Sequence, residues 1–500
     1  MRALVIGGGM SGLVAARELA LAGHATTVLE ASRRWGGCVG SHAVAGLTLD
    51  SGAESFATRS TAVADLAAEL GLGERVTAPL PGGAWVLLPD GPRELPRTGV
   101  LGIPANPWDP EVRRTLGLPG ALRASLDRFL PSSIGTKGDV TSVAGLVRAR
   151  MGRRVLQRLV DPVVGGVHSA DPALLDVDMV APGLRAGLRE HGSLAASVAR
   201  LRGVPGSRTP CTGTDSSASK NGKGGGTKAG SAVAGLSGGM HTLVTALVAE
   251  LENLGVAMLP ARRVTSVRRN GEGTWIAMAG DSVYAGDQLV MALDGPAAVG
   301  LLAEAVPELA GLSPAAGPDV RLVTLVVDKP ELDTRPRGTG VLVAPGAGGV
   351  RAKALTHATG KWQWLQDQAG PGRHVLRLSY GRRDGVADNR PGNAAADVPV
   401  AEASAGTAAD HQLFEAALRD ASTLLDVPLE KADVRGWDVV RWQGALPFAA
   451  VGHRQRVAAV RRMCAEAGGL SVVGGWVAGN GLAAVVADTR QQMGRQNLSP

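Results

Sequence analysis

A glycine-rich turn near the amino terminus has the residue types and spacing of a dinucleotide-binding site. It reads Gly7, Gly8, Gly9, Met10, Ser11, Gly12. In a G-x-G-x-x-G turn, the first glycine permits a tight bend, the second lets the backbone approach a pyrophosphate, and the third lets a helix pack closely on a strand. The helix N-terminus offers unpaired N–H groups and about half a positive charge to the phosphates. The pattern predicts dinucleotide binding, against the alternative of a plain strand-to-helix turn.

An acidic residue follows at the position of a ribose acceptor. Glu30 ends the second apolar run, Val28-Leu29-Glu30. Its carboxylate can accept hydrogen bonds from a ribose 2′-OH, and its negative charge argues against a 2′-phosphate. The predicted ligand therefore carries an unmodified ribose at this position.

The elements that must position these residues are a strand, a helix and a second strand. Residues 3–6 form a short apolar run, and residues 13–21 carry the apolar spacing of a helix. Strand, glycines, helix, strand and acid in this order predict a Rossmann-like unit.

The residues that follow resemble a family signature. Glu30 to Val39 is similar to the E-A-S-x-R-x-G-G signature of FAD-dependent oxidoreductases of the amine oxidase and protoporphyrinogen oxidase superfamily. Leu49 to Phe56 is similar to that superfamily's loop beneath the flavin ring. The resemblance implies a flavoprotein.

Further stretches resemble the oxygen-dependent porphyrinogen oxidases, specifically the Gram-positive, actinobacterial type that acts on coproporphyrinogen III. They are Val163 to Pro172, Leu236 to Met240, Lys353 to Thr356 with Lys361-Trp362, Arg377 to Arg382, and Arg441 to His453. One departure is Phe448-Ala449, which stands where the family usually has Gln-Tyr.

The resemblance implies a set of FAD-contacting residues. They are Gly7, Gly8, Gly9, Met10, Ser11, Gly12, Glu30, Ala31, Arg34, Cys38, Gly52, Ala53, Glu54, Ser55, Val264, Trp442, Asn480, Gly481 and Leu482. Within this set, the backbone of Val264 would meet the adenine, and Trp442 and Asn480 to Leu482 would lie near the flavin. We expect noncovalent binding, because no Cys or His sits in a recognisable attachment motif. Cys38 is expected to be a small packed residue without a redox role.

The implied reaction belongs to haem biosynthesis and removes six hydrogens from a porphyrinogen, with O₂ as acceptor and H₂O₂ as co-product. Because the flavin carries the chemistry, no side chain is predicted to be an acid or base. His168 is expected to be structural rather than a base. The alternatives left open are protoporphyrinogen IX as substrate, an amine oxidase or carotenoid desaturase on the same fold, and a flavin-binding protein without turnover.

Arginines are the expected partners of the substrate propionates, because a guanidinium binds a carboxylate bidentately. The candidates are Arg59, just beyond the flavin loop, with Arg150 and Arg154 from a predicted helix after Thr141-Ser142. The alternative for the helical arginines is a solvated face. Residues 111–200 hold 13 basic and 8 acidic side chains, a local charge of +5, which points to an anionic partner for that region.

Composition narrows the class of protein. The 500 residues are 45% hydrophobic and 19% charged, with a formal charge of +7. No apolar run is long enough to span a bilayer, and the immediate strand-and-glycine start leaves no room for a signal peptide. Cys38, Cys211 and Cys464 are an odd, widely spaced set, which argues against disulfides or a metal site and for the cytoplasm. Nucleic acid is not expected as a partner, whereas peripheral contact with a membrane or with the next haem-pathway enzyme stays open, as does the oligomeric state.

The expected fold is α/β, or α+β overall: a Rossmann-like FAD-binding domain of the amine oxidase superfamily with a second mixed sheet and a helical cap. The FAD-binding domain is predicted to be discontinuous, from residues 1–80, 235–300 and 440–500. The substrate-binding sheet is assigned to 81–110 and 301–439, and the cap to 111–204. A polar segment at 205–234 lacks the apolar residues needed to fold and is expected to be a disordered insertion, and a second loose segment is expected at 384–410.

Overall fold

The computed structural model describes residues 1–96, 99–138, 141–203, 233–381, 407–444 and 449–496. Parts of several predictions lie outside these residues. They are residues 205–232 of the first predicted insertion, 384–406 of the second, Cys211, Arg382 and Phe448.

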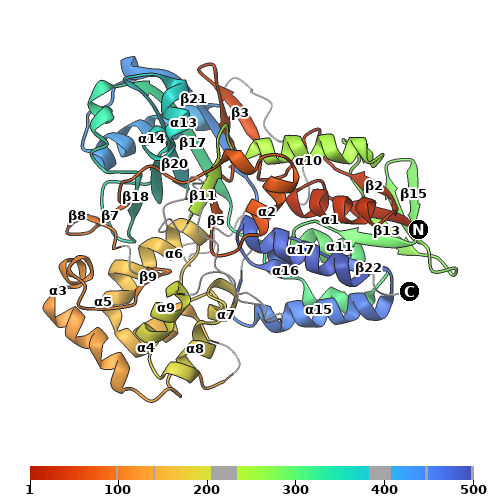
Figure 1. The fold of residues 1–500 in the computed structure, drawn as a ribbon, viewed down its shortest axis with the longest axis horizontal. Helices are drawn as coiled ribbons and strands as arrows, with labels where there is room; N and C mark the ends of the chain where they lie inside the picture. Colours follow the sequence, from red (N-terminus) through yellow and green to blue (C-terminus); the bar gives the residue numbers. More distant parts are fainter. Residues whose placement is uncertain (97–98, 139–140, 204–232, 382–406, 445–448, 497–500) are drawn as a thin grey trace, which may run out of the picture.

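A five-stranded parallel sheet forms the nucleotide-binding unit, on the right in Figure 1. Its strands, in spatial order, are β12 (Ala257–Leu259), β2 (Ala25–Leu29), β1 (Arg2–Ile6), β16 (Gln288–Met291) and β22 (Leu470–Val472). Along β1, Ala3 and Val5 enter one buried cluster and Leu4 and Ile6 another, as expected for a strand covered on both faces. The sheet collects strands from three distant parts of the chain.

Helices cover both faces of this sheet. The cluster on one face includes residues of α1 (Met10–Leu21), α2 (Ala62–Glu69), α10 (His241–Asn253) and α17 (Leu482–Gln496). The other face packs against α11 (Gly295–Leu302), α15 (His453–Ala467) and the meander β13 (Ser266–Arg269), β14 (Trp275–Ala279), β15 (Ser282–Gly286). The short helix α16 (Gly475–Ala478) joins β22 to α17, and a small sheet pairs β11 (Val233–Leu236) with β5 (Phe56–Ala57) and β6 (Val76–Thr77).

A seven-stranded mixed sheet forms the second unit, at the upper left of Figure 1. Its spatial order is β21 (Val434–Trp442), β17 (Val320–Asp328), β20 (Arg373–Tyr380), β19 (Ala354–His357), β18 (Gly340–Val343), β7 (Trp85–Leu88) and β8 (Gly91–Glu94). Neighbours are antiparallel except β18 and β7. One face packs on α14 (Ala408–Leu425), and the other on the hairpin β3 (Ser41–Val44), β4 (Leu47–Asp50) with α12 (Ala358–Lys361) and α13 (Gln363–Ala369). The predicted mixed sheet is confirmed.

Helices of the described residues between 110 and 203 form the cap, at the lower left of Figure 1, around a core of their own. They are α3 (Pro110–Ser125), α4 (Val143–Met151), α5 (Arg153–Val155), α6 (Asp161–His168), α7 (Val177–Val180), α8 (Leu184–His191) and α9 (Leu194–Gly203). The helix predicted after Thr141-Ser142 is interrupted at Gly152, which adopts φ +91°. Its apolar stripe, at Val147, Met151, Val155 and Leu159, continues across this break. All four stripe residues are nevertheless buried, so the apolar period was read correctly and the break was missed.

Two of the predicted boundaries between the three units differ from the boundaries that the packing indicates. The hairpin β9 (Gly99–Val100), β10 (Ile103–Pro104) contributes Val100 and Ile103 to the cap core rather than to the sheet unit. Residues beyond 300, including Leu302 and Leu309, pack with the nucleotide-binding unit. We therefore propose to keep the three-unit division with these two boundaries moved.

The expectation of a loose segment up to residue 410 is wrong at its end. Thr407 and Asp410 form a reciprocal capping box at the start of α14, and Asp410 is buried. Among the described helices, none is long and apolar enough to cross a membrane.

Candidate flavin site

Two glycines of the first turn are required by the fold itself. Gly7 has φ +107°, and a Cβ there would lie 2.6 Å from the carbonyl oxygen of Ala292 on the neighbouring strand's end. A Cβ on Gly12 would lie 1.8 Å from the carbonyl oxygen of Gly7. A larger residue at position 12 would push α1 away from the end of β1, and one at position 7 would clash with the chain that follows β16 and strain the positive φ.

Gly9 is different, because nothing in the described protein requires a glycine there. Its backbone is ordinary for any residue, with φ −71° and ψ 178°, and a Cβ would meet no described atom within 4 Å. Gly9 is the N-cap of α1, whose first residues Met10, Ser11 and Gly12 are buried. No side chain of the described residues caps this N-terminus, and its first turn contains no acid. A buried helix start left without a partner fits the anionic pyrophosphate of a dinucleotide.

Glu30 is held beside this turn by backbone donors. One carboxylate oxygen accepts from Gly8 N at 2.7 Å and the other from Ser32 N at 2.7 Å. The Glu30 carbonyl accepts from Arg262 N at 2.7 Å, which lays the segment leading to Val264 alongside. The structure thus brings the predicted ribose acceptor and the predicted adenine contact together, while Ala31 and Arg34 lie nearby and exposed.

The second glycine pair and the flavin loop meet beyond the turn. Gly36 N donates to Gly8 O at 2.8 Å, and a Cβ on Gly37 would lie 3.2 Å from the Cα of Gly9. Ala53 N donates to Cys38 O at 2.9 Å, and a Cβ on Gly52 would lie 2.0 Å from that oxygen. These contacts fix the loop Gly52 to Ser55 against the residues around Cys38.

Two further side chains complete this region. Trp442, at the end of β21, donates from Nε1 to Ser51 O at 3.0 Å, so the predicted tryptophan does reach the loop. The side chain of Cys38 is exposed, yet surrounding protein atoms bury its sulfur enough to raise the pKa of the thiol.

Glu54 anchors the loop through a contact that sequence reasoning missed. Lys361 Nζ lies 2.6 Å and Arg377 Nη1 2.7 Å from its two carboxylate oxygens, and Arg377 also donates to Gly52 O at 2.7 Å. Burial alone would raise the pKa of Glu54, but the charges and hydrogen bonds of the two cations lower it to about 2. Lys361 and Arg377 both belong to stretches that were noted only for their resemblance to the family. The sequence signal that could have predicted their contact with Glu54 was the presence of an acid in the flavin loop.

The carboxy-terminal glycine junction returns to the same place. A Cβ on Gly474 would lie 3.6 Å from Ser11 Oγ, so the turn after β22 faces the first glycine turn. Asn480 Nδ2 lies 3.2 Å from Nδ1 of His168 at the end of α6, and Gly481 (φ +115°) precedes Leu482, the first residue of α17. Burial lowers the pKa of His168 to about 4. The neutral imidazole contacts Asn480, and its structural role stays a prediction.

Ser169, the residue after His168, contacts a lysine whose role the sequence reasoning did not identify. Lys353 is 2% exposed, and its ammonium contacts the hydroxyl of Ser169, the C-cap of α6. A cation at a helix C-terminus is favoured by the helix dipole. Lys353 therefore ties the second sheet to the end of α6 that carries His168.

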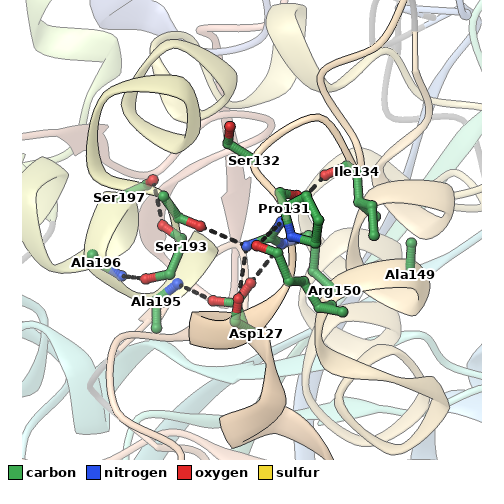
Figure 2. A network of polar contacts seen from close by, with 12 residues as sticks. Asp127, Pro131, Ser132, Ile134, Ala149, Arg150, Ser193, Ala195, Ala196 and Ser197 are labelled. Carbon is green, nitrogen blue, oxygen red and sulfur yellow. Dashed lines mark hydrogen bonds and ion pairs between the residues drawn. The ribbon is translucent and has the colours of Figure 1, made fainter.

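The three candidate substrate arginines are not brought together. Arg150 is 0% exposed, and its Nε donates to Asp127 Oδ1 at 2.6 Å (Figure 2). Its two terminal nitrogens donate to backbone oxygens, with Pro131 at 2.7 Å and with Asp127 and Gly192 at 2.8 Å each. A guanidinium this saturated has no donor left for a propionate, and it is not on a solvated face. Both predictions for Arg150, as a substrate contact and as part of a solvated face, are therefore wrong.

Arg154 also serves the cap, since its Nη1 donates to Leu116 O at 3.1 Å. Arg59 lies exposed two residues beyond β5, and its assignment to substrate stays a prediction.

Comparison with known proteins places the chain in a family. The family model described as flavin containing amine oxidoreductase matches residues 10–489. The chain therefore belongs to the flavin-containing amine oxidoreductases, and it is an oxidoreductase whose cofactor is FAD.

Two relatives and one solved structure show which kinds of flavoprotein the chain is similar to. The coproporphyrinogen III oxidase of Mycobacterium leprae is 30% identical over 461 residues, covering 91% of this chain and 90% of that protein. Protoporphyrinogen oxidase 2 of Arabidopsis thaliana is 30% identical over 206 residues, covering 40% of this chain and 39% of that protein. A crystal structure from Exiguobacterium sp. 255-15, provisionally named a protoporphyrinogen oxidase, shares the fold with a TM-score of 0.77 at 23% identity, covering 99% of this chain and 98% of that one.

Proposed function

We propose that this chain oxidises coproporphyrinogen III to coproporphyrin III in haem biosynthesis, with O₂ as the electron acceptor. Removal of six hydrogens consumes three molecules of O₂ and releases three of H₂O₂. The observation that carries the proposal is the similarity to the mycobacterial coproporphyrinogen III oxidase over 91% of the chain, cap and second sheet included. FAD, when bound, accepts the hydride equivalents and passes them to oxygen.

The residues of this chain supply position and electrostatics. The N-terminus of α1, open at Gly9, would hold the pyrophosphate, and Glu30 the ribose. The loop Gly52 to Ser55, fixed by the pair of cations on Glu54, would support the flavin ring together with Trp442. The start of α17, at Asn480 to Leu482, would offer backbone N–H groups from the other side.

A reduction experiment without oxygen tests the proposal. The purified yellow protein is mixed with coproporphyrinogen III in the absence of air, and the flavin absorbance is followed. We expect bleaching by substrate, recovery of the yellow colour on admitting air, and three H₂O₂ for each coproporphyrin III. A flavin that stays oxidised with this substrate contradicts the proposal.

A second candidate substrate is protoporphyrinogen IX. The similarity to the plant protoporphyrinogen oxidase favours it, but that similarity covers only 40% of this chain. Protoporphyrinogen carries two carboxylates rather than four and would need a more apolar pocket. Bleaching by protoporphyrinogen IX, with none by coproporphyrinogen III, would favour this candidate.

We further propose that FAD binds noncovalently and that the enzyme acts in the cytoplasm with peripheral contacts. Acid precipitation should release all of the yellow chromophore into solution. Chromophore retained on the precipitated protein would contradict noncovalent binding.

A further inference from the structure

Four arginines are exposed together at one end of the candidate flavin site. Two backbone hydrogen bonds lay the segment after β2 beside the segment after β12, from Ala261 N to Ser32 O at 2.8 Å and from Arg262 N to Glu30 O at 2.7 Å. Glu30 is the predicted ribose acceptor, so we call this the adenosine end of the site. The adenosine-end arginines are the four exposed cations of these two segments: Arg33, Arg34, Arg262 and Arg263.

The positive charge of the adenosine-end arginines is not balanced locally. None of the four forms an ion pair with another residue of the described part of the chain. Glu30 is the only acid in residues 30–34 and 259–264. Its carboxylate oxygens already accept from Gly8 N and Ser32 N at 2.7 Å each, so this acid is held by the backbone and not by a guanidinium. Four positive charges therefore stand against one negative charge in these two segments.

The Glu30 carboxylate also places this charge close to the expected pyrophosphate. Gly8, one of its two donors, precedes Gly9, the N-cap of α1 that no side chain of the described residues caps. Ser32, the other donor, precedes Arg33. A single carboxylate is short compared with the Debye length of about 10 Å at 0.1 M salt. The adenosine-end arginines can therefore attract an anion that approaches the N-terminus of α1.

We propose that the adenosine-end arginines steer FAD to its site by attracting the negatively charged pyrophosphate before the backbone N–H groups of α1 bind it. Clustered charges of one sign raise the association rate of an oppositely charged ligand by about 10- to 1000-fold. Arg34 was expected to contact FAD, and the proposal adds Arg33, Arg262 and Arg263 as residues that act on its association. FAD fits better than an acidic protein surface, because the arginines border the dinucleotide site itself. The proposal rests on the placement of FAD proposed above and not on the identity of the substrate.

Stopped-flow binding of FAD to the full chain, freed of its flavin by dialysis against potassium bromide, tests this proposal. We expect the association rate constant to fall as salt rises from about 10 mM to about 1 M, because the Debye length shrinks from about 30 Å to about 3 Å. The variant Arg33→Gln/Arg262→Gln/Arg263→Gln should bind FAD about tenfold more slowly than the unaltered protein at the low salt concentration, and equally fast at the high one. Its dissociation rate constant should change by less than about threefold, because a charge at the rim of a site acts mainly on association.

A matched control removes the same charge from the cap. Arg113→Gln/Arg114→Gln/Arg148→Gln changes three exposed arginines of α3 and α4, and α3 lies at the opposite end of the molecule from β2 in Figure 1. This control should bind FAD as fast as the unaltered protein does. Equal slowing of both triple variants, or an association rate that salt does not change, would overturn the proposal.

Unchanged association in the adenosine-end variant would also overturn it, and would leave the charge of these arginines to an acidic partner. These measurements use no substrate, so they are independent of the proposed reaction. An error in the placement of FAD would show separately, as a Gly9→Val variant that stays yellow.

Discussion

The three glycines at the motif positions of the first turn, Gly7, Gly9 and Gly12, have different physical reasons for being glycine. Gly7 and Gly12 are needed by the protein's own packing, and such positions can be predicted from a strand-to-helix turn. Gly9 is needed by nothing in the described chain, so its explanation lies in the ligand. The sequence pattern predicted this division of roles, whereas the open space beside Gly9 required the structure.

Replacing Gly9 by Val tests that explanation. We expect Gly9→Val to fold, because its backbone conformation suits valine and a Cβ at this position meets no described atom within 4 Å. The added methyl groups would occupy the space in front of the N-terminus of α1, so the purified variant should be colourless. Flavin absorbance and circular dichroism measure the two expectations, with Gly300→Val, an exposed position on α11, as the control. A yellow, active Gly9→Val would mean that the pyrophosphate lies elsewhere.

Glu54 shows what sequence reasoning could not supply at this scale. It was predicted as a cofactor contact, but its partners Lys361 and Arg377 lie more than 300 residues away in the sequence. The pKa of Glu54 is about 2 in the folded protein, below its ordinary value of 4.5. Its ionised form therefore stabilises the fold fully above pH 4.5, and that contribution is lost as the pH falls toward 2.

The variant Glu54→Gln should lose this stabilisation. At pH 7 we expect the free energy of unfolding to fall by about 3 kcal/mol, since one pKa unit corresponds to about 1.4 kcal/mol. The difference from the unaltered protein should shrink as the pH is lowered from 4.5 toward 2. Urea denaturation at several pH values measures this, with Glu308→Gln, at an exposed position, as the control. A pH-independent difference would show that the carboxylate charge is not the cause.

At the scale of elements, apolar runs were enough to locate strands but not to find every helix boundary. The region 301–439, which was predicted to form most of the second sheet, holds β17, β18, β19 and β20 and most of β21. The break at Gly152 was missed because the apolar period continues through it. The start of α14 did have a sequence signal, Thr407 followed three residues later by Asp410, and this was overlooked within a polar segment.

The burial of Arg150 could not be predicted from its own helix. Its neighbours in the sequence suggest a basic stripe, whereas Asp127 and the carbonyl of Gly192 come from other parts of the cap. Arg150→Met should lower the free energy of unfolding by about 3–5 kcal/mol, because Asp127 would be left as an unpaired buried charge. Arg148→Met, at an exposed neighbouring position, should change it by no more than about 0.5 kcal/mol.

Urea unfolding and steady-state kinetics of both arginine variants check the assignment. Arg150→Met should keep kcat/KM close to that of the unaltered protein at temperatures where it is folded. A large loss of kcat/KM with unchanged stability would instead return Arg150 to the list of substrate contacts.

At the scale of the whole molecule, strand order could be predicted only through the family resemblance. The parallel sheet pairs β1 with β16, which begins at residue 288, and β16 with β22, which begins at residue 470. Pairings at such separations leave no local signal in the sequence. The same holds for the cap, where His168 at the end of α6 contacts Asn480 in the carboxy-terminal glycine junction. The flavin site thus depends on contacts among all three units.

The most direct test of the proposed reaction compares steady-state turnover of the FAD-loaded protein with coproporphyrinogen III and with protoporphyrinogen IX, following porphyrin fluorescence and H₂O₂ together. We predict a higher kcat/KM for coproporphyrinogen III, with three H₂O₂ formed for each porphyrin. A higher kcat/KM for protoporphyrinogen IX, or no turnover of either compound, would contradict the account.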